Sequence, residues 1–158
     1  MNPDVLRVMI SRLTALGYQI RKTPSKKGLI LLAKEEPFHR KLLLIGTNLY
    51  QAEEWRNFII QTVLAERNGR MPLALAVLVL GIGEGQREQG ILDYLGKMPW
   101  VEAIWRVVDE ELFGVKTHFR WQVEEKILLL TTRLASASFP VEEKPSGGER
   151  EKGPVPLR

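Results

Sequence analysis

The stretch LALAVLVL, from Leu73 to Leu80, is apolar at every position and ends at Gly81. A helix that crosses a bilayer needs about 20 apolar residues, so this run is too short to be one. Its length and β-branched content are typical of a strand buried on both faces, and such strands are usually parallel and lie inside a sheet. The octet therefore predicts an interior strand around which the rest of the chain is organised.

The segments before the octet alternate between helical and extended patterns. The first and the last of these five segments carry apolar side chains at helical spacing, and Gly17 can end the first helix in a left-handed conformation. The inner three are short apolar runs separated by turn residues, which favours an antiparallel meander. In chain order we expect a helix from Pro3 to Leu16, strands at Tyr18–Lys22, Leu29–Lys34 and Lys41–Gly46, and a helix from Asn48 to Arg67.

The segments after the octet continue the alternation of helix and strand. In chain order we expect a helix at Gln86–Lys97, a parallel strand at Val101–Val108, a loop or short turn at Asp109–Lys116, and a helix that Thr117 caps and that ends near Leu134. The whole order is α-β-β-β-α-β-α-β-α. It predicts an α/β protein with a mixed sheet, covered by helices on both faces in a three-layer αβα arrangement.

Residues 1–135 have the composition of a single α/β domain, and residues 136–158 differ from them. Proline and glycine interrupt the later segment, which carries mixed charge and almost no large apolar side chain. Such a segment cannot bury enough surface to offset the entropy of ordering. We therefore expect a disordered tail or linker after the domain.

The composition excludes cysteine chemistry and bears on the cellular compartment. The chain has no cysteine, which excludes disulfides, a thiolate nucleophile and a Cys-ligated metal. The segment that begins at Met1 lacks the basic stretch and apolar core of a signal peptide, and no apolar run reaches transmembrane length. These features predict a cytoplasmic protein.

Two features suggest catalysis or a bound nucleotide, but each lacks residues that the corresponding motif requires. The loop 81–85 lies between a buried strand and a helix, where phosphate-binding turns lie, but its glycines have the wrong spacing and no Gly-Lys-Ser/Thr follows. The only histidines, His39 and His118, are not accompanied by a Gly-x-Ser-x-Gly elbow. We therefore expect no enzyme activity and no resident cofactor, with both histidines on the surface.

The densest acidic cluster is Asp109, Glu110 and Glu111, just past the last expected strand. Converging carboxylates bind hard divalent cations such as Mg²⁺ or Mn²⁺. Adjacent residues point in different directions, however, so convergence needs help from elsewhere in the fold. The cluster is the best candidate for an ion site, and the alternative is a solvated edge.

The basic excess lies in the first third of the chain. Residues 1–48 carry nine Lys/Arg against three Asp/Glu, a net charge of +6. Residues 49–138 carry ten against twelve, a net charge of −2, and the whole chain has a net charge of +4. Four of the cations surround the first expected hairpin: Arg21, Lys22, Lys26 and Lys27. They indicate either a solvated face or a contact with nucleic acid or lipid headgroups.

A helix, a three-stranded meander, a helix and a strand resemble the core of the restriction-endonuclease-like fold. In nucleases of that fold, an Asp followed by Asp/Glu-x-Lys on the meander strands binds the metal ion. Here the run 42–45 offers no acid, and Glu35 and Glu36 follow Lys34 rather than precede it. The resemblance therefore implies the fold without its metal-assisted nuclease activity.

The runs Leu13-Thr14-Ala15-Leu16-Gly17-Tyr18 and Gly28-Leu29-Ile30-Leu31-Leu32 resemble the N-terminal domains of bacterial rhomboid-type intramembrane serine proteases. The Pro-rich segment that ends at Arg158 would suit a linker before a membrane segment. The resemblance covers about residues 5–134, and none of the membrane protease's catalytic residues lies within it. It implies a domain whose partner is a membrane-embedded domain or another protein.

Together these observations predict a non-catalytic accessory or binding domain, attached to a membrane protein and sensing a ligand or a divalent ion. The first alternative is a nucleic-acid-binding protein that uses the basic hairpin. The second is an enzyme with carboxylate chemistry in the loops at the ends of the central strands, where Glu84 and Asp109 lie.

Overall fold

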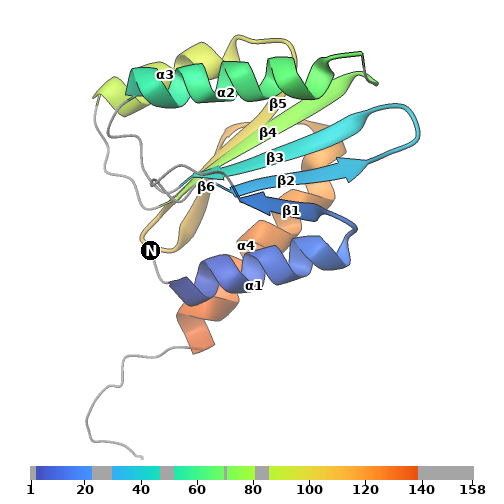
Figure 1. The fold of residues 1–158 in the computed structure, drawn as a ribbon. Helices are drawn as coiled ribbons and strands as arrows, with labels where there is room; N and C mark the ends of the chain where they lie inside the picture. The colour runs from blue at the N-terminus through green and yellow to red at the C-terminus, as the bar shows by residue number, and fades with distance from the viewer. Residues whose placement is uncertain (1–2, 23–29, 47–51, 70, 81–85, 139–158) are drawn as a thin grey trace, which may run out of the picture.

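A computed structural model describes residues 3–22, 30–46, 52–69, 71–80 and 86–138 of the chain. Within these ranges six strands form one sheet, in the spatial order β1-β2-β3-β4-β5-β6 (Figure 1). The elements are α1 (Pro3–Ala15), β1 (Gln19–Lys22), β2 (Ile30–Glu35), β3 (Arg40–Gly46), α2 (Ala52–Arg67), β4 (Leu73–Leu80), α3 (Gln86–Gly96), β5 (Val101–Val108), β6 (Glu111–Lys116), a 3-10 turn η1 (Phe119–Trp121) and α4 (Gln122–Ser138).

The apolar octet is the interior strand that the sequence predicts. Strand β4 pairs in parallel with β3 on one side and with β5 on the other, and all of its residues are buried. The three strands before it form the expected antiparallel meander, in which β2 pairs with both β1 and β3. An apolar run without alternation is stable here because helices cover both faces of the sheet.

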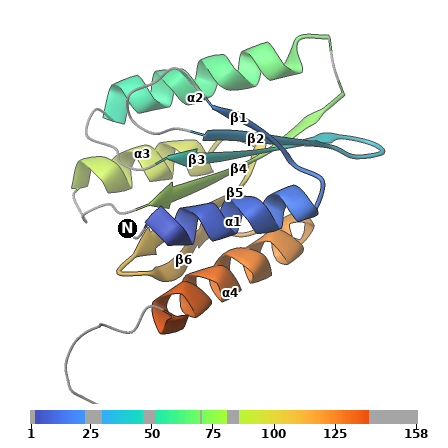
Figure 2. The ribbon, with the colours of Figure 1, turned by 60° about the horizontal axis from the view of Figure 1, so that its bottom comes forward.

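The helices lie in two layers, one on each face of the sheet (Figures 1 and 2). Helices α2 and α3 cover one face, and the side chains of Leu75 and Val77 face their core. Helices α1 and α4 pack side by side on the other face, towards which Ala76 and Leu78 point. The α/β class and the three-layer arrangement are confirmed.

The segment after β5 corrects one prediction. We expected a loop or short turn at Asp109–Lys116, but Glu111–Lys116 forms strand β6, antiparallel to β5. Asp109 and Glu110 make the hairpin turn with positive φ angles of 51° and 62°. Two such residues in a row match the right-handed twist of a hairpin. The strand lacks an obvious pattern because it is a largely exposed sheet edge.

The last helix begins later and ends later than predicted. Thr117 does not cap it; His118 caps the turn η1, and its Nδ1 accepts a hydrogen bond from the backbone N–H of Arg120 at 3.2 Å. Helix α4 then continues to Ser138, beyond the expected end at Leu134. The predicted tail began at residue 136, but residues 136–138 belong to α4. The predicted capping residues of α2, the glycine-rich loop 81–85 and the rest of the tail, residues 139–158, lie outside the described residues.

Candidate functional site

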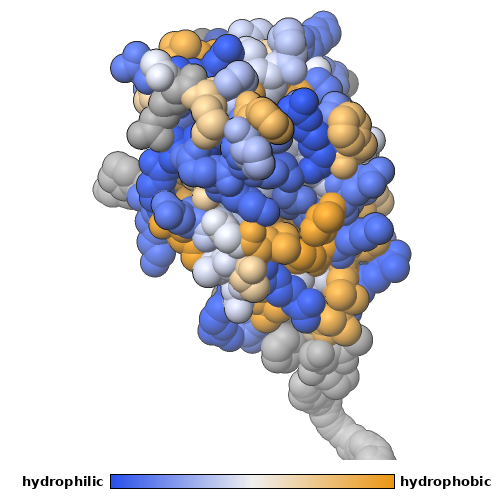
Figure 3. Space-filling model, turned by 90° about the vertical axis from the view of Figure 1, so that its right-hand side faces the viewer, coloured by the Kyte–Doolittle hydropathy of each residue, from blue (hydrophilic) through white to orange (hydrophobic). Residues whose placement is uncertain are grey.

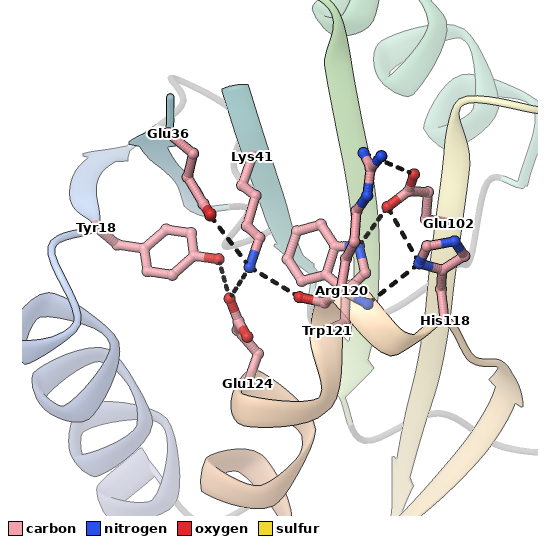
Figure 4. Close-up of polar contacts among 8 residues, drawn as sticks. All are labelled: Tyr18, Glu36, Lys41, Glu102, His118, Arg120, Trp121 and Glu124. Carbon is pink, nitrogen blue, oxygen red and sulfur yellow. Dashed lines mark hydrogen bonds and ion pairs between the residues drawn. The ribbon is translucent and has the colours of Figure 1, made fainter. Parts of the chain in front are cut away.

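A cluster of polar side chains is buried between the sheet and the first turn of α4 (Figure 4). Its centre is Lys41 on β3. Lys41 is paired in register with Ala74, whose side chain faces the α1/α4 core, so the lysine side chain extends into the same layer. Tyr18, Glu36 and Glu124 surround the ammonium group from three other parts of the chain. We call these four residues the Lys41 cluster.

The ammonium group of Lys41 donates two hydrogen bonds and forms one longer ion pair. Nζ lies 2.8 Å from Oε1 of Glu124, 2.8 Å from the carbonyl oxygen of Arg120 and 3.3 Å from Oε2 of Glu36. The same nitrogen lies 5.1 Å from the centroid of the Trp121 ring, within cation–π range. Only 9% of the Lys41 side chain is exposed, and these contacts offset the cost of burying its charge.

Glu124 is the most deeply buried acid of the cluster, with 2% of its side chain exposed. It lies in the first turn of α4, where the helix dipole favours a negative charge. The phenol of Tyr18 donates a hydrogen bond of 2.8 Å to Oε1 of Glu124. Burial, and then the charge of Glu124, raise the pKa of Tyr18 far above its ordinary value, so this phenol remains a donor.

Two tight turns bring Tyr18 and Glu36 to the cluster. Gly17 has a φ of 101°, and the backbone N–H of Tyr18 donates to the carbonyl of Leu13 at 3.2 Å, so the chain folds back under α1. Between β2 and β3, the backbone N–H of Glu36 donates to the carbonyl of His39 at 3.0 Å. This turn places Glu36 beside Lys41 on the neighbouring strand.

A second polar group fastens η1 to strand β5. Glu102 accepts a hydrogen bond of 3.1 Å from Nε1 of Trp121 and lies 3.5 Å from the guanidinium of Arg120. His118 Nδ1 lies 3.7 Å from the same carboxylate. Since Arg120 and Trp121 also contact Lys41, the two groups together fix the start of α4 against the sheet (Figure 4).

The predicted nucleic-acid contacts are only partly described. Arg21 and Lys22 are exposed on strand β1. The Arg21 guanidinium lies 3.1 Å from Glu66 of α2, which also binds Arg40 of β3 at 2.9 Å. The other two cations of the predicted hairpin, residues 26 and 27, lie outside the described residues.

The acids of the predicted ion site belong to the β5–β6 hairpin. Asp109 and Glu110 form its turn, and Glu111 is the first residue of β6. Among the residues that the structure describes, no three His, Asp or Glu side chains gather as a metal site would require. The histidines behave as structural groups: His118 caps η1 and His39 closes the β2–β3 turn through its carbonyl.

Sequence reasoning missed every member of the Lys41 cluster. Lys41 looked like the polar start of a strand, and Glu36 like the end of another. One signal was present: Glu124 stands four residues before Leu128 and eleven before Ala135, both buried, so its position belongs to the inward face of the helix. An acid at a core position of an amphipathic helix indicates a buried partner.

Comparisons with protein-family profiles, curated proteins and solved structures found no match to this chain. Of the helices in the described ranges, none combines the length and the apolar content needed to cross a membrane. The functional argument therefore depends on the geometry of the chain itself.

Proposed function

We propose that this chain is a non-catalytic accessory or binding domain with a restriction-endonuclease-like core, in which a buried ion network stands where a reactive site would be needed. The observation that carries the proposal is the engagement of Lys41. Its ammonium group donates hydrogen bonds to Glu124 and to the backbone carbonyl of Arg120, and it forms a longer ion pair with Glu36.

One oxygen of each carboxylate in the cluster lies against Lys41. Metal-assisted hydrolysis needs carboxylate oxygens that are open to a cation and a site that admits water and substrate. Here Oε1 of Glu124 accepts from both Lys41 and Tyr18. Oε2 of Glu36 lies 3.3 Å from the Lys41 ammonium, which would repel a second cation. This arrangement supports a structural role for the cluster.

The proposal includes attachment to a membrane-embedded protein. What supports this part is the resemblance of the α1–β1 segment, from Leu13 to Tyr18, to the N-terminal domains of rhomboid-type proteases. The sequence places this motif at the end of α1, where it also delivers Tyr18 to the Lys41 cluster.

A nuclease assay tests the proposal. The full chain is incubated with labelled single- and double-stranded DNA in Mg²⁺ or Mn²⁺, beside the variants Lys41→Met and Lys97→Met. Lys97 is an exposed lysine after α3 and serves as the matched control. We expect no cleavage that depends on Lys41. Metal-dependent cleavage that Lys41→Met abolishes and Lys97→Met retains would contradict the proposal.

Nucleic-acid binding without hydrolysis is a second candidate, favoured by the exposed side chains of Arg21 and Lys22 on the edge strand β1. Phosphate contacts make affinity fall steeply with salt. Fluorescence anisotropy of a labelled oligonucleotide at increasing salt tests this candidate, with Lys26→Glu/Lys27→Glu and Lys22→Glu as variants. Unchanged affinity in these variants would exclude the hairpin as a binding surface.

A further inference from the structure

Helix α4 exposes several apolar side chains on its outer face. Its inner face is mixed, with Leu128 buried beside the polar Glu124. On the outside, Val123 is 56% exposed, Leu130 46% and Leu134 41%. A surface helix ordinarily turns polar residues to water, so these exposed apolar side chains indicate a contact surface.

The three exposed residues and the half-buried Ile127 form one continuous stripe. Val123, Ile127, Leu130 and Leu134 follow one another at spacings of four, three and four residues, so they lie on a single helical face. We call them the α4 stripe. At 1.5 Å per residue it is about 17 Å long. Apolar side chains gather over the lower, α1/α4 layer in Figure 3, with hydrophilic residues around them.

Basic side chains border the stripe. Lys126 stands three residues after Val123, and Arg133 stands three residues after Leu130, so each lies beside the stripe on the helix surface, and both are exposed. Of the acids of α4, Glu124 is buried against Lys41, which leaves the half-buried Glu125. The exposed charges beside the stripe on α4 are therefore positive.

We infer that the α4 stripe docks on a lipid bilayer whose headgroups are anionic. An apolar helical face bordered by Lys and Arg is the arrangement by which interfacial helices bind such surfaces, with the apolar side chains at the acyl boundary and the cations at the headgroups. Charge complementarity selects this occupant over a second copy of the chain. A second copy would present the same basic border, and the two would repel.

This inference goes beyond the proposed function, which is argued from the buried Lys41 cluster and from the α1–β1 segment, and not from the outer face of α4. The two fail independently. Lys41-dependent nuclease activity would overturn the proposed function and leave bilayer docking intact, whereas loss of bilayer docking would leave the Lys41 cluster as it is.

Vesicle co-sedimentation of the full chain tests the inference. Vesicles of phosphatidylcholine with phosphatidylglycerol are compared with vesicles of phosphatidylcholine alone, at low and high salt. We expect binding to the anionic vesicles, weakened by salt, and little binding to the neutral ones. Equal binding to both vesicles, or no binding to either, would overturn the inference.

Matched variants locate the surface. The double variant Leu130→Gln/Leu134→Gln should weaken partitioning at least about tenfold, because it removes apolar area from the contact. The double variant Lys126→Gln/Arg133→Gln should weaken it about tenfold, on anionic vesicles only. The controls are Leu64→Gln and Arg67→Gln on α2, in the opposite helix layer, where Leu64 is 65% exposed. Equal loss in the α2 controls would place the contact elsewhere.

Light scattering after gel filtration, without vesicles, tests whether a second copy of the chain binds the α4 stripe instead. We expect a monomer for the wild type and for every variant. A wild-type dimer that Leu130→Gln/Leu134→Gln converts to a monomer would identify a second copy as the occupant and overturn the bilayer assignment. Circular dichroism confirms that each variant is folded, which is expected because the substituted side chains are exposed.

Discussion

The two faces of the sheet are packed by different physics. Beneath α2 and α3 the core is built from aliphatic side chains such as Leu75, Val77 and Leu92. Beneath α1 and α4 an equally buried core surrounds an ion network, with Lys41 and Glu124 at its centre. The first layer is held mainly by non-directional burial of apolar area, with one ion pair between Arg40 of β3 and Glu66 of α2, whereas the centre of the second requires specific partners at hydrogen-bond distance.

This difference explains how the chain can fix the position of α4. Apolar contacts alone tolerate sliding of a helix, but a buried charge has low energy only where its partners are. Lys41 bonds to Glu124 and to the carbonyl of Arg120, which flank the start of the helix. We propose that the network specifies the register of α4 on the sheet.

The largest effect is expected when the network is broken from one side. Lys41→Met should lower the free energy of unfolding by about 3–5 kcal/mol, because it leaves the carboxylate of Glu124 buried without its cation. Urea denaturation followed by tryptophan fluorescence measures this, since Trp121 lies against Lys41. The control Lys97→Met should change stability by less than about 0.5 kcal/mol. Equal effects of the two variants would show that the buried contact contributes nothing.

In the aliphatic core beneath α2 and α3, the stability of the protein should depend on the side-chain volume that a substitution removes. Leu92→Ala on α3 removes a fully buried side chain and should cost about 3 kcal/mol. The comparison with the other layer becomes sharper if the cost of Leu92→Ala is the same at pH 7 and at alkaline pH, because Leu92 packs in a cluster of aliphatic side chains. A cost that changes strongly with pH would mean that the two layers are coupled.

Tyr18 gives the polar layer a pH dependence that the aliphatic core lacks. Its pKa is raised in the folded state, so its contribution to stability is complete below about pH 10 and is lost as the pH rises further. Between the unfolded and the folded pKa the wild type should lose about 1.4 kcal/mol per pH unit from this group. Tyr18→Phe should cost about 2 kcal/mol at pH 7 and remove that alkaline slope. An unchanged slope would contradict the assignment.

The smallest effect is expected at the rim of the network. Glu36 is 19% exposed and lies 3.3 Å from Lys41 Nζ, whereas Glu124 is nearly inaccessible and lies at 2.8 Å. Glu36→Gln should therefore cost only about 0.5–1 kcal/mol, as a partly solvated ion pair does. Thermal denaturation of this variant beside Glu124→Gln ranks the two acids, and a larger loss at Glu36 would reverse our interpretation of which carboxylate matters.

Most of the secondary structure could be predicted from the sequence because these elements have local sequence patterns of their own. The apolar octet, the stop at Gly17 and the three short strands each carry their own signal, and all three predictions are confirmed. The strand β6 was missed because an exposed edge strand needs no apolar alternation, and its turn uses Asp109 and Glu110 where Asn and Gly would be the strong signal.

The Lys41 cluster could not be predicted for a different reason. Lys41 and Glu124 are separated by 83 residues, and their pairing appears only when β3 and α4 meet on the same face of the sheet. The buried face of α4 could not be predicted either. Residues 127–130 are four apolar residues in a row, so the pattern does not show which side of the helix faces the sheet. The tertiary contact, rather than the local pattern, decides which of them is buried.

A double-mutant cycle between Lys41 and Glu124 tests the central claim most directly. Lys41→Met and Glu124→Met are measured singly and together by urea denaturation at pH 7. If the pair is a structural ion contact, each single variant is strongly destabilised and the double variant recovers at least about 2 kcal/mol of the summed loss. Additive losses, with no recovery in the double variant, would contradict the claim that this pair holds α4 on the sheet.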